Sequence, residues 1–268
     1  ATVSAATPPR ASALAAGFLL LCSTASYAGQ SCGESELDPQ ELANALEIAE
    51  KTRQYLISQN AQTAIIARVG QDLKKYGLRY SHLGLVYQDK PGHYTVLHEL
   101  NECGSDRSGL YEEGLGNFFL DDVFAFEVLV MLPPAELQQG LNTAILNKNA
   151  LKIHFPEYNM LAYPFSDNYQ NSNQWGLELI AHVLHNQQSL DRAELQNWLE
   201  AEHYQPGIIS VDPVSRIGAS AFRANVTFTD HPLKQRLNGE YQVVTVESVQ
   251  QFLQKRYPNL TQQVLSLP

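Results

Sequence analysis

The chain has 268 residues, 44% of which are hydrophobic, and its formal net charge at pH 7 is −10. This length and this apolar content are sufficient for one large domain, or two small ones, with a hydrophobic core. The acidic balance, with no basic cluster along the chain, excludes an electrostatic footprint for nucleic acid, and anionic membrane surfaces would repel such a chain. We therefore expect a globular protein without a nucleic-acid partner.

The N-terminal segment has the features of a secretory signal peptide. Arg10 is the only charged residue before Glu34, and residues 11–21 form a small and apolar run. Residues 26–28, Ser-Tyr-Ala, then offer a cleavage site of the small-x-small type. The apolar run is too short to span a bilayer.

We expect residues 1–28 to be the signal peptide and residues 29–268 to form a single α+β domain that is periplasmic or secreted, with no stable membrane span. An N-terminal membrane anchor and a lipid-modified Cys22 remain alternatives. Cleavage would leave two cysteines, Cys32 and Cys103. In an exported chain they predict one disulfide between them. Two unpaired thiols are the alternative.

Helix and strand signals alternate along the rest of the chain. Asp38 as a cap, with proline at the first helical position, predicts a helix that ends near residue 58. Further helices are expected after 133–134, from 172 to about 185, after the cap at 191, and over 247–257. Strands are expected over 63–69, 80–88, 94–100, 221–229 and 241–246, with 152–163 as another candidate. Residues 128–132 fit a strand or a buried helix, and residues 110–126 fit neither pattern.

The turn residues at 89–92 predict that the second and third strands form a hairpin. Strands grouped between flanking helices are typical of the α+β class.

Two histidines lie on the predicted hairpin. His82 begins one strand, and His98 is on the neighbouring strand, within reach of a hydrogen bond. Gly84, on the same strand face as His82, is expected to leave open space beside the imidazole. With a nucleophile such histidines would supply a base and a group that orients it. Two half-buried histidines without a chemical role are the alternative.

Ser172 stands where polar residues give way to an apolar helical run. A side chain there lies in the field of the helix N-terminus, which would activate a cysteine but benefits a serine much less. Asn171, Ser172 and Asn173 are all good N-cap residues, so a capping role for Ser172 is the alternative.

The Ser-His-x-Gly strand at 81–84, the strand with His98, and the Asn-Ser-Asn-Gln-Trp segment at 171–175 resemble the circularly permuted NlpC-type branch of the papain-like hydrolases. More closely, the mature chain resembles an uncharacterised exported bacterial family, domain of unknown function 2145. The resemblance implies a papain-like α+β fold, in which an antiparallel sheet packs against helices, with extra C-terminal strands and helices.

By the same resemblance His82 would be the general base, His98 its orienting partner, and Ser172 would occupy the position of the nucleophilic cysteine. Tyr169 or Gln170 could join the backbone N–H of Ser172 in an oxyanion pocket. The expected function is hydrolysis of an amide, ester or thioester in a cell-wall peptide, peptidoglycan or acyl-type substrate. The serine leaves three alternatives open: an engineered inactive variant, a natural pseudoenzyme that binds in the same groove, and a serine hydrolase.

Other polar clusters are interpreted as parts of the surface. His182 and His185 could bind a metal on one helix face, but a surface pair without a third ligand is the simpler interpretation. The adjacent acids Glu112 and Glu113 are interpreted as solvated. We therefore expect no metal and no cofactor.

Overall fold

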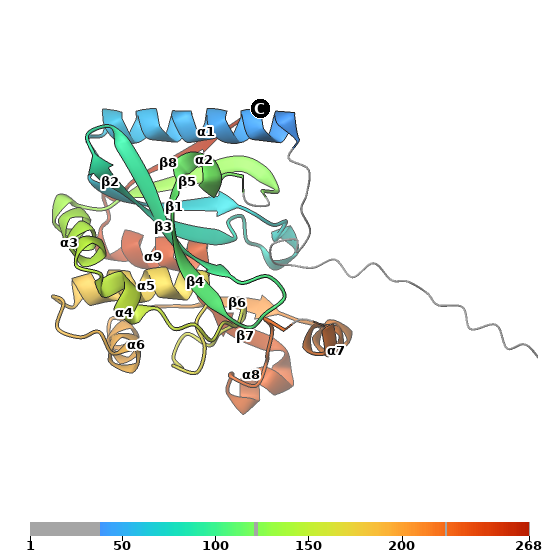
Figure 1. The fold of residues 1–268 in the computed structure, drawn as a ribbon. Coiled ribbons are helices and arrows are strands. Elements are labelled where there is room, and N and C mark those ends of the chain that lie inside the picture. Colours follow the sequence, from blue (N-terminus) through green and yellow to red (C-terminus); the bar gives the residue numbers. More distant parts are fainter. Residues whose placement is uncertain (1–37, 121–122, 223, 268) are drawn as a thin grey trace, which may run out of the picture.

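The computed structural model describes residues 38–120, 123–222 and 224–267, so the predicted signal peptide lies outside the described residues. The protein is a mixed α+β structure with a six-stranded antiparallel sheet between helices (Figure 1). The strand order is β4-β3-β2-β1-β5-β8. These strands are β1 (Thr63–Val69), β2 (His82–Lys90), β3 (His93–Asn101), β4 (Ser108–Gly114), β5 (Ala125–Leu132) and β8 (Thr261–Ser266).

The centre of the sheet follows directly from the sequence pattern. β1 is rich in β-branched residues and is buried along its whole length, as expected for a strand with covered faces. The predicted hairpin forms between β2 and β3, where Lys90 pairs with His93. Gly92 in the turn has φ +74°, a conformation that glycine adopts without strain. Residues 128–132 belong to a strand, β5, and not to a buried helix.

One face of the sheet is covered by α1 (Pro39–Ser58) and α2 (Leu115–Phe118). α1 begins as predicted, because Asp38 accepts a hydrogen bond from the backbone N–H of Gln40 at 2.8 Å. Its buried side chains, including Ile48 and Leu56, pack with those of β1, β2 and β5.

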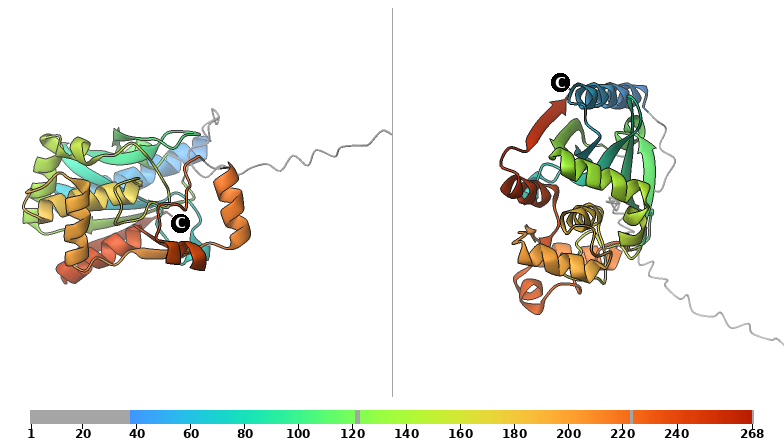
Figure 2. Two further views of the ribbon diagram at one scale, coloured as in Figure 1. Left: turned by 90° about the horizontal axis from the view of Figure 1, so that it is seen from below. Right: turned by 90° about the vertical axis from the view of Figure 1, so that its left-hand side faces the viewer.

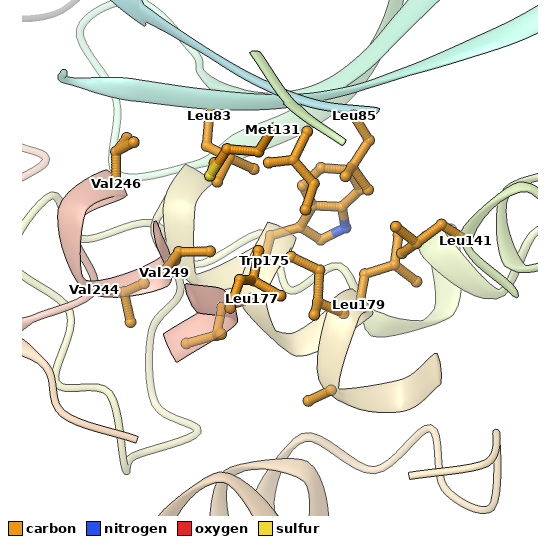
Figure 3. Packing of buried hydrophobic residues seen from close by; sticks show 14 of the residues in the cluster. Leu83, Leu85, Met131, Leu141, Trp175, Leu177, Leu179, Val244, Val246 and Val249 are labelled. Carbon is orange, nitrogen blue, oxygen red and sulfur yellow. The ribbon is translucent and has the colours of Figure 1, made fainter. Parts of the chain in front are cut away.

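The other face is covered by α3, α4, α5 and α9, and α6 packs outside α5 (Figure 2). Their bounds are α3 (Ala135–Leu146), α4 (Asn149–Ile153), α5 (Ser172–Leu184), α6 (Arg192–Ala201) and α9 (Val246–Arg256). α5 is the central helix of this layer. Trp175 on its first turn is fully buried among Leu83, Leu85 and Met131 (Figure 3), and its indole donates to the carbonyl of Ala150 at 3.2 Å.

A small lobe follows α6. It contains a two-stranded sheet and two helices: β6 (Gly207–Ser210), β7 (Glu240–Val243), α7 (Pro213–Phe222) and α8 (Leu233–Asn238). Leu161, Val226, Tyr241 and Val243 form a separate apolar cluster in this lobe. No helix among the described residues has both the length and the hydropathy needed to cross a bilayer.

Two predicted strands are absent from the described residues. Over 221–229, α7 continues to Phe222 and an irregular segment follows. The Asn159 side chain bonds both the N–H and the carbonyl of Thr227, at 3.0 Å each, and so replaces a partner strand there. Residues 152–163 form the end of α4 and a loop that is held by isolated bridges at Glu157 and Tyr158.

Two elements near the C-terminus also differ from the sequence prediction. Of the predicted strand over 241–246, only 241–243 pair in a sheet, as part of β7, because Thr245 is the N-cap residue of α9. After α9 the chain returns to the sheet as the edge strand β8, which the sequence analysis missed. The alternation of apolar and polar residues in β8 is weak, since most of its side chains are exposed.

Gly84 does not leave open space, and this prediction was wrong. A Cβ on Gly84 would lie 2.8 Å from Cγ1 of Val96 and 3.1 Å from the Phe118 ring, so the strand and α2 already fill the position. We predict that Gly84→Ala lowers the free energy of unfolding by about 1–3 kcal/mol through overpacking. Chemical denaturation measures this change.

The control is Gly218→Ala in α7, where an added Cβ meets no atom within 4 Å. Alanine is favoured over glycine inside a helix by about 0.5–1 kcal/mol, so the control variant should not lose stability. Equal stability of the Gly84→Ala variant and the unsubstituted protein would contradict the close packing described above.

Candidate active site

The start of α5 meets the start of β2, and this contact brings Ser172 to His82. Asn171 is the N-cap residue, and its side chain accepts a hydrogen bond from the N–H of Gln174 at 2.9 Å. Ser172 is therefore the first helical residue, and the interpretation of Ser172 as the cap was wrong. Its Oγ lies 3.2 Å from Nδ1 of His82. The side-chain oxygen of Asn173 accepts from the N–H of Leu83 at 3.0 Å and fixes the helix to the strand.

The second imidazole continues this line of contacts. Nε2 of His82 lies 2.9 Å from Nδ1 of His98, and the two rings meet edge to face at an interplanar angle of 71°. Phe118 packs against both rings, with centroid distances of 5.9 and 5.3 Å. The structure thus brings together the three residues that the sequence analysis assigned to the reaction.

A carboxylate stands at the far end of the two imidazoles. Oε2 of Glu113 on β4 lies 3.3 Å from Nε2 of His98. No described residue forms an aligned hydrogen bond with this Nε2 atom, so Glu113 acts on it mainly through its charge. Glu113 is therefore not simply solvated, in contrast to the sequence interpretation. Its neighbour Glu112 points to the opposite face of the strand, where it accepts from the hydroxyl of Tyr87 at 3.3 Å.

His82 is a neutral base in this environment. Burial lowers the pKa of His82 well below its usual value, and the nearby charge of Arg68 lowers it further, as would a positive charge on His98. Arg68 lies opposite His82 in the β1–β2 register, and its guanidinium sits over the Phe118 ring. A neutral imidazole that donates from Nε2 to His98 leaves Nδ1 as an acceptor for the hydroxyl of Ser172.

The site opens into a cavity of about 570 Å³, within the range of small-ligand pockets. His82 and Ser172 lie in its wall together with the phenol of Tyr158, which is beside the Ser172 hydroxyl. The facing wall comes from the small lobe and includes Ile209 and Phe228. The sequence analysis missed Tyr158, because it lies in a loop that was considered as a strand.

Tyr169 and Gln170 do not line this cavity. The Gln170 amide is fully buried and holds the preceding loop, since it accepts from the N–H of Phe155 at 2.7 Å and donates to the carbonyl of Ile153 at 3.2 Å. The carbonyl of Tyr169 accepts from Arg192 at 2.8 Å. The structure therefore places both residues in the support of the site and not at its surface.

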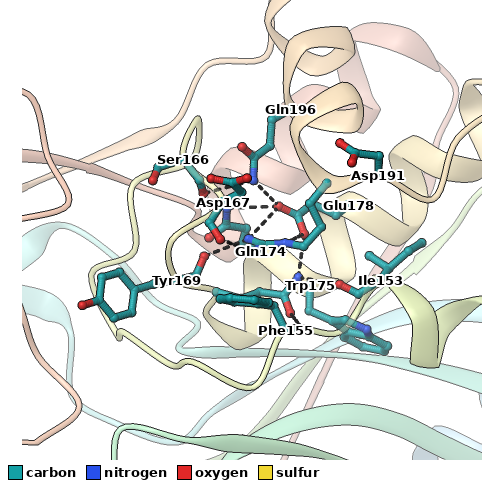
Figure 4. A network of polar contacts seen from close by, with 12 residues as sticks. Ile153, Phe155, Ser166, Asp167, Tyr169, Gln174, Trp175, Glu178, Asp191 and Gln196 are labelled. Carbon is teal, nitrogen blue, oxygen red and sulfur yellow. Dashed lines mark hydrogen bonds and ion pairs between the residues drawn. The ribbon is translucent and has the colours of Figure 1, made fainter.

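A buried polar network lies behind the helix start (Figure 4). The carboxylate of Glu178 on α5 is 2.8 Å from Nε of Arg192 on α6, and both side chains are buried. Three glutamine side chains complete the set around Glu178: Gln170, Gln174 and Gln196. Arg192 also donates to the carbonyl of Asp167 at 3.0 Å, so the network ties two helices to the loop that leads to Ser172.

Glu99, next to His98 on β3, is a second buried acid at the cavity wall. Neither of its carboxyl oxygens has an aligned hydrogen bond to a described residue, although the Ser108 hydroxyl lies close. Burial raises the pKa of Glu99 from 4.5 to about 8, and the charge of Glu178 contributes to the rise. The carboxyl group is therefore mostly neutral at pH 7.

The remaining candidates lie away from the cavity. Cys103, in the turn between β3 and β4, is disulfide-bonded. Cys32 lies outside the described residues, so its pairing with Cys103 stays a prediction. His182 is buried and contacts the carbonyl of Ser189, so the interpretation of His182 as a surface residue was wrong. In the described part of the chain, no three His, Cys, Asp or Glu side chains are grouped as metal ligands.

The buried ion pair yields a stability prediction. Glu178→Ala leaves Arg192 buried without its carboxylate, and we expect a loss of about 3–5 kcal/mol in the free energy of unfolding. The matched control is Glu47→Ala, which removes an exposed ion pair to Lys51 on α1 and should change stability by less than about 1 kcal/mol. Urea denaturation of both variants measures the difference. Similar small losses would show that the network is dispensable.

Glu99 makes stability depend on pH. Between about pH 4.5 and pH 8 the folded protein keeps a proton on Glu99 that the unfolded chain has released. Stability should therefore fall as pH rises through this window, by about 1.4 kcal/mol per pH unit from this group alone. Glu99→Gln should remove this contribution. The measurement is urea denaturation of both proteins from pH 5 to pH 8, and parallel curves would refute the assignment.

Comparison with known proteins identifies a family. Residues 55–253, which include His82, His98, Glu113 and Ser172, match the family described as "Uncharacterized protein conserved in bacteria (DUF2145)". No match was found among curated proteins or solved structures. The match covers most of the chain and all parts of the candidate site, and the chain therefore belongs to this bacterial DUF2145 family.

Proposed function

We propose that this protein is an exported hydrolase of papain-like architecture, periplasmic or secreted, that attacks an amide, ester or thioester carbonyl with Ser172. One observation carries the proposal: the 3.2 Å contact of the Ser172 hydroxyl with His82, whose other nitrogen is held by His98 at 2.9 Å. The packing of α5 against an antiparallel sheet supports the papain-like comparison. A base and an orienting partner lined up on a hydroxyl are the arrangement needed for nucleophilic catalysis.

The proposed reaction begins when Oγ of Ser172 bonds to the carbonyl carbon and its proton moves to Nδ1 of His82. The negative charge then forms on the carbonyl oxygen, near the first N–H groups of α5, which have no partners within the helix. The phenol of Tyr158 is a further donor, because burial raises its pKa and keeps it protonated. His82 passes the proton to the leaving group, and water attacks the acyl-serine with help from the same base.

The environment of His82 suits an alcohol better than a thiol. A thiolate would require a charged imidazole, which burial and Arg68 disfavour, whereas an alcohol reacts through concerted proton removal by a neutral base. The same low pKa makes His82 a weak base, so the proposed reaction is slow. The substrates considered are cell-wall peptides, peptidoglycan and acyl groups, since the cavity combines a polar wall at Ser172 with apolar side chains from the small lobe.

A second candidate function is binding without cleavage. It is favoured by the serine at a position where related papain-like enzymes are expected to carry cysteine. In this case the protein would be an envelope binding protein that holds a peptide or acyl chain in the same cavity. The contacts among His82, His98 and Glu113 would then orient the ligand and would not remove a proton.

A fluorophosphonate probe tests the first proposal. We expect the wild-type protein to be labelled at Ser172, and His82→Ala to lower the labelling rate by about 100-fold, because the hydroxyl loses its base. Peptide mass spectrometry locates the label. The matched control is Ser215→Ala, which changes another serine of the cavity wall and should leave the labelling of Ser172 unchanged.

A cysteine variant separates the two functions. If Ser172→Cys reacts with iodoacetamide in a His82-dependent manner while the wild type resists the fluorophosphonate, His82 still activates the group at position 172. The binding function is then favoured. If the wild type resists the probe and the thiol reacts equally fast with and without His82, the catalytic proposal fails.

A further inference from the structure

A line of polar groups runs from Ser172 through His82 and His98 to Glu113, which is its solvent-facing end. The β3–β4 register pairs His98 with Tyr111 and Val96 with Glu113, so Glu113 lies diagonally across from His98 on the same face of the sheet. The side chain of His98 is fully buried, while that of Glu113 is 25% exposed. This line therefore connects a buried hydroxyl to a carboxylate that water can reach.

The surroundings of the two imidazoles differ in charge. His82 lies opposite Arg68, and burial together with this cation lowers the pKa of His82. His98 instead has a carboxylate at 3.3 Å. His98 therefore has an acid beside it, whereas His82 has a cation opposite it.

We propose that Glu113 is a positioning residue that draws the catalytic proton across both imidazoles, so that the positive charge formed during attack rests on His98. The proposal depends on the proposed function, because it describes how the general base of that site takes up the proton. Glu113 itself touches no reacting atom and acts only through His98.

The carboxylate also fixes the direction of the line. The negative charge of Glu113 favours an N–H over a lone pair on the nitrogen 3.3 Å away, so the proton of a neutral His98 is placed on Nε2 and its Nδ1 becomes an acceptor. His82 then donates from Nε2 to His98, and Nδ1 of His82 is free to accept from Ser172. Reversal of any one of these tautomers would present an N–H to the serine and remove the base.

The proton transfer balances without any further reactant. The Oγ–H bond of Ser172 breaks as its electron pair forms the bond to the carbonyl carbon, and the proton goes to Nδ1 of His82. The proton on Nε2 of His82 passes to Nδ1 of His98, which becomes an imidazolium beside the Glu113 carboxylate. Both transfers reverse when the leaving group takes its proton.

Within the described ranges, three further ionisable groups lie near this pair. Arg68 comes from β1, Tyr111 stands opposite His98 on β4, and Tyr158 lies on the far side of Ser172. α2 contributes only the apolar ring of Phe118. Among these groups Glu113 is the acid whose oxygen lies within ion-pair distance of an imidazole nitrogen.

The kinetic test compares Glu113→Gln with Glu112→Gln, a neighbouring acid on the opposite face of the same strand. We expect Glu113→Gln to lower the fluorophosphonate labelling rate of Ser172 by about 10- to 100-fold and to alter its pH profile. Glu112→Gln should leave both unchanged, and Glu113→Asp should restore part of the rate. Equal rates in the two glutamine variants would overturn the proposal.

A second measurement does not depend on activity. Nitrogen-15 NMR of labelled histidines reports which ring nitrogen carries the proton. We expect His98 to carry it on Nε2 in the wild type and in Ser172→Ala, and to lose this preference in Glu113→Gln. A proton on Nδ1 of wild-type His98 would overturn the proposal. If Ser172 never reacts with the probe, the proposed function fails, and the NMR measurement still decides the role of Glu113.

Discussion

The position of Ser172 depends on the joint between the first turn of α5 and the first residues of β2. The side chain of Asn173 accepts from the backbone of Leu83 and donates to the carbonyl of Ser81 at 3.3 Å, so one amide holds helix and strand together. Gly176, one turn later, allows the close approach, because a Cβ there would lie 2.5 Å from the Leu83 side chain. Because β2 begins with His82, any movement of this joint would change the distance from the Ser172 hydroxyl to the His82 imidazole.

The same helix is stabilised from behind by charges that have little access to water. A buried ion pair alone adds little net stability, because desolvation offsets its attraction. The pair Glu178–Arg192 is instead surrounded by amide donors and backbone carbonyls, so its charges are satisfied from several sides. The network joins α5, α6 and the loop before Ser172. Glu99, at the edge of this region, has no such partners and remains protonated.

Residues with strong local signals were predicted well from the sequence. The caps at Asp38 and Asp191 and the β-branched run of β1 are local features, and the structure has them where they were expected. The prediction failed where contacts with residues distant in the sequence, and not the local residue pattern, determine the backbone conformation. The segment around Thr227 is held by an asparagine side chain and not by a strand, and β8 pairs with β5, which is distant in the sequence.

Within the site, His82, His98 and Ser172 came from motif and spacing, but Glu113 and Tyr158 did not. Recognition of Glu113 required the β3–β4 register, which no local pattern in residues 110–126 indicated. Once that strand is known, alternation alone places Tyr111 and Glu113 on the face of His98 and Glu112 on the other. Recognition of Tyr158 required the path of an irregular loop, and that path depends on the buried network.

The burial of both imidazoles determines the electrostatics of the site. Phe118 fills the space left by Gly84 and packs against both imidazoles, which are buried. In such surroundings a single carboxylate influences the imidazoles more strongly than it would at the surface. A thiolate at position 172 would require a charged imidazole on His82, which burial and Arg68 disfavour. In the proposed mechanism, the serine separates charge only when the carbonyl is attacked, and stabilisation of the cation formed at that moment lowers the barrier. In the proposed mechanism, Arg68 opposite His82 and Glu113 beside His98 favour a cation on His98, next to the acid.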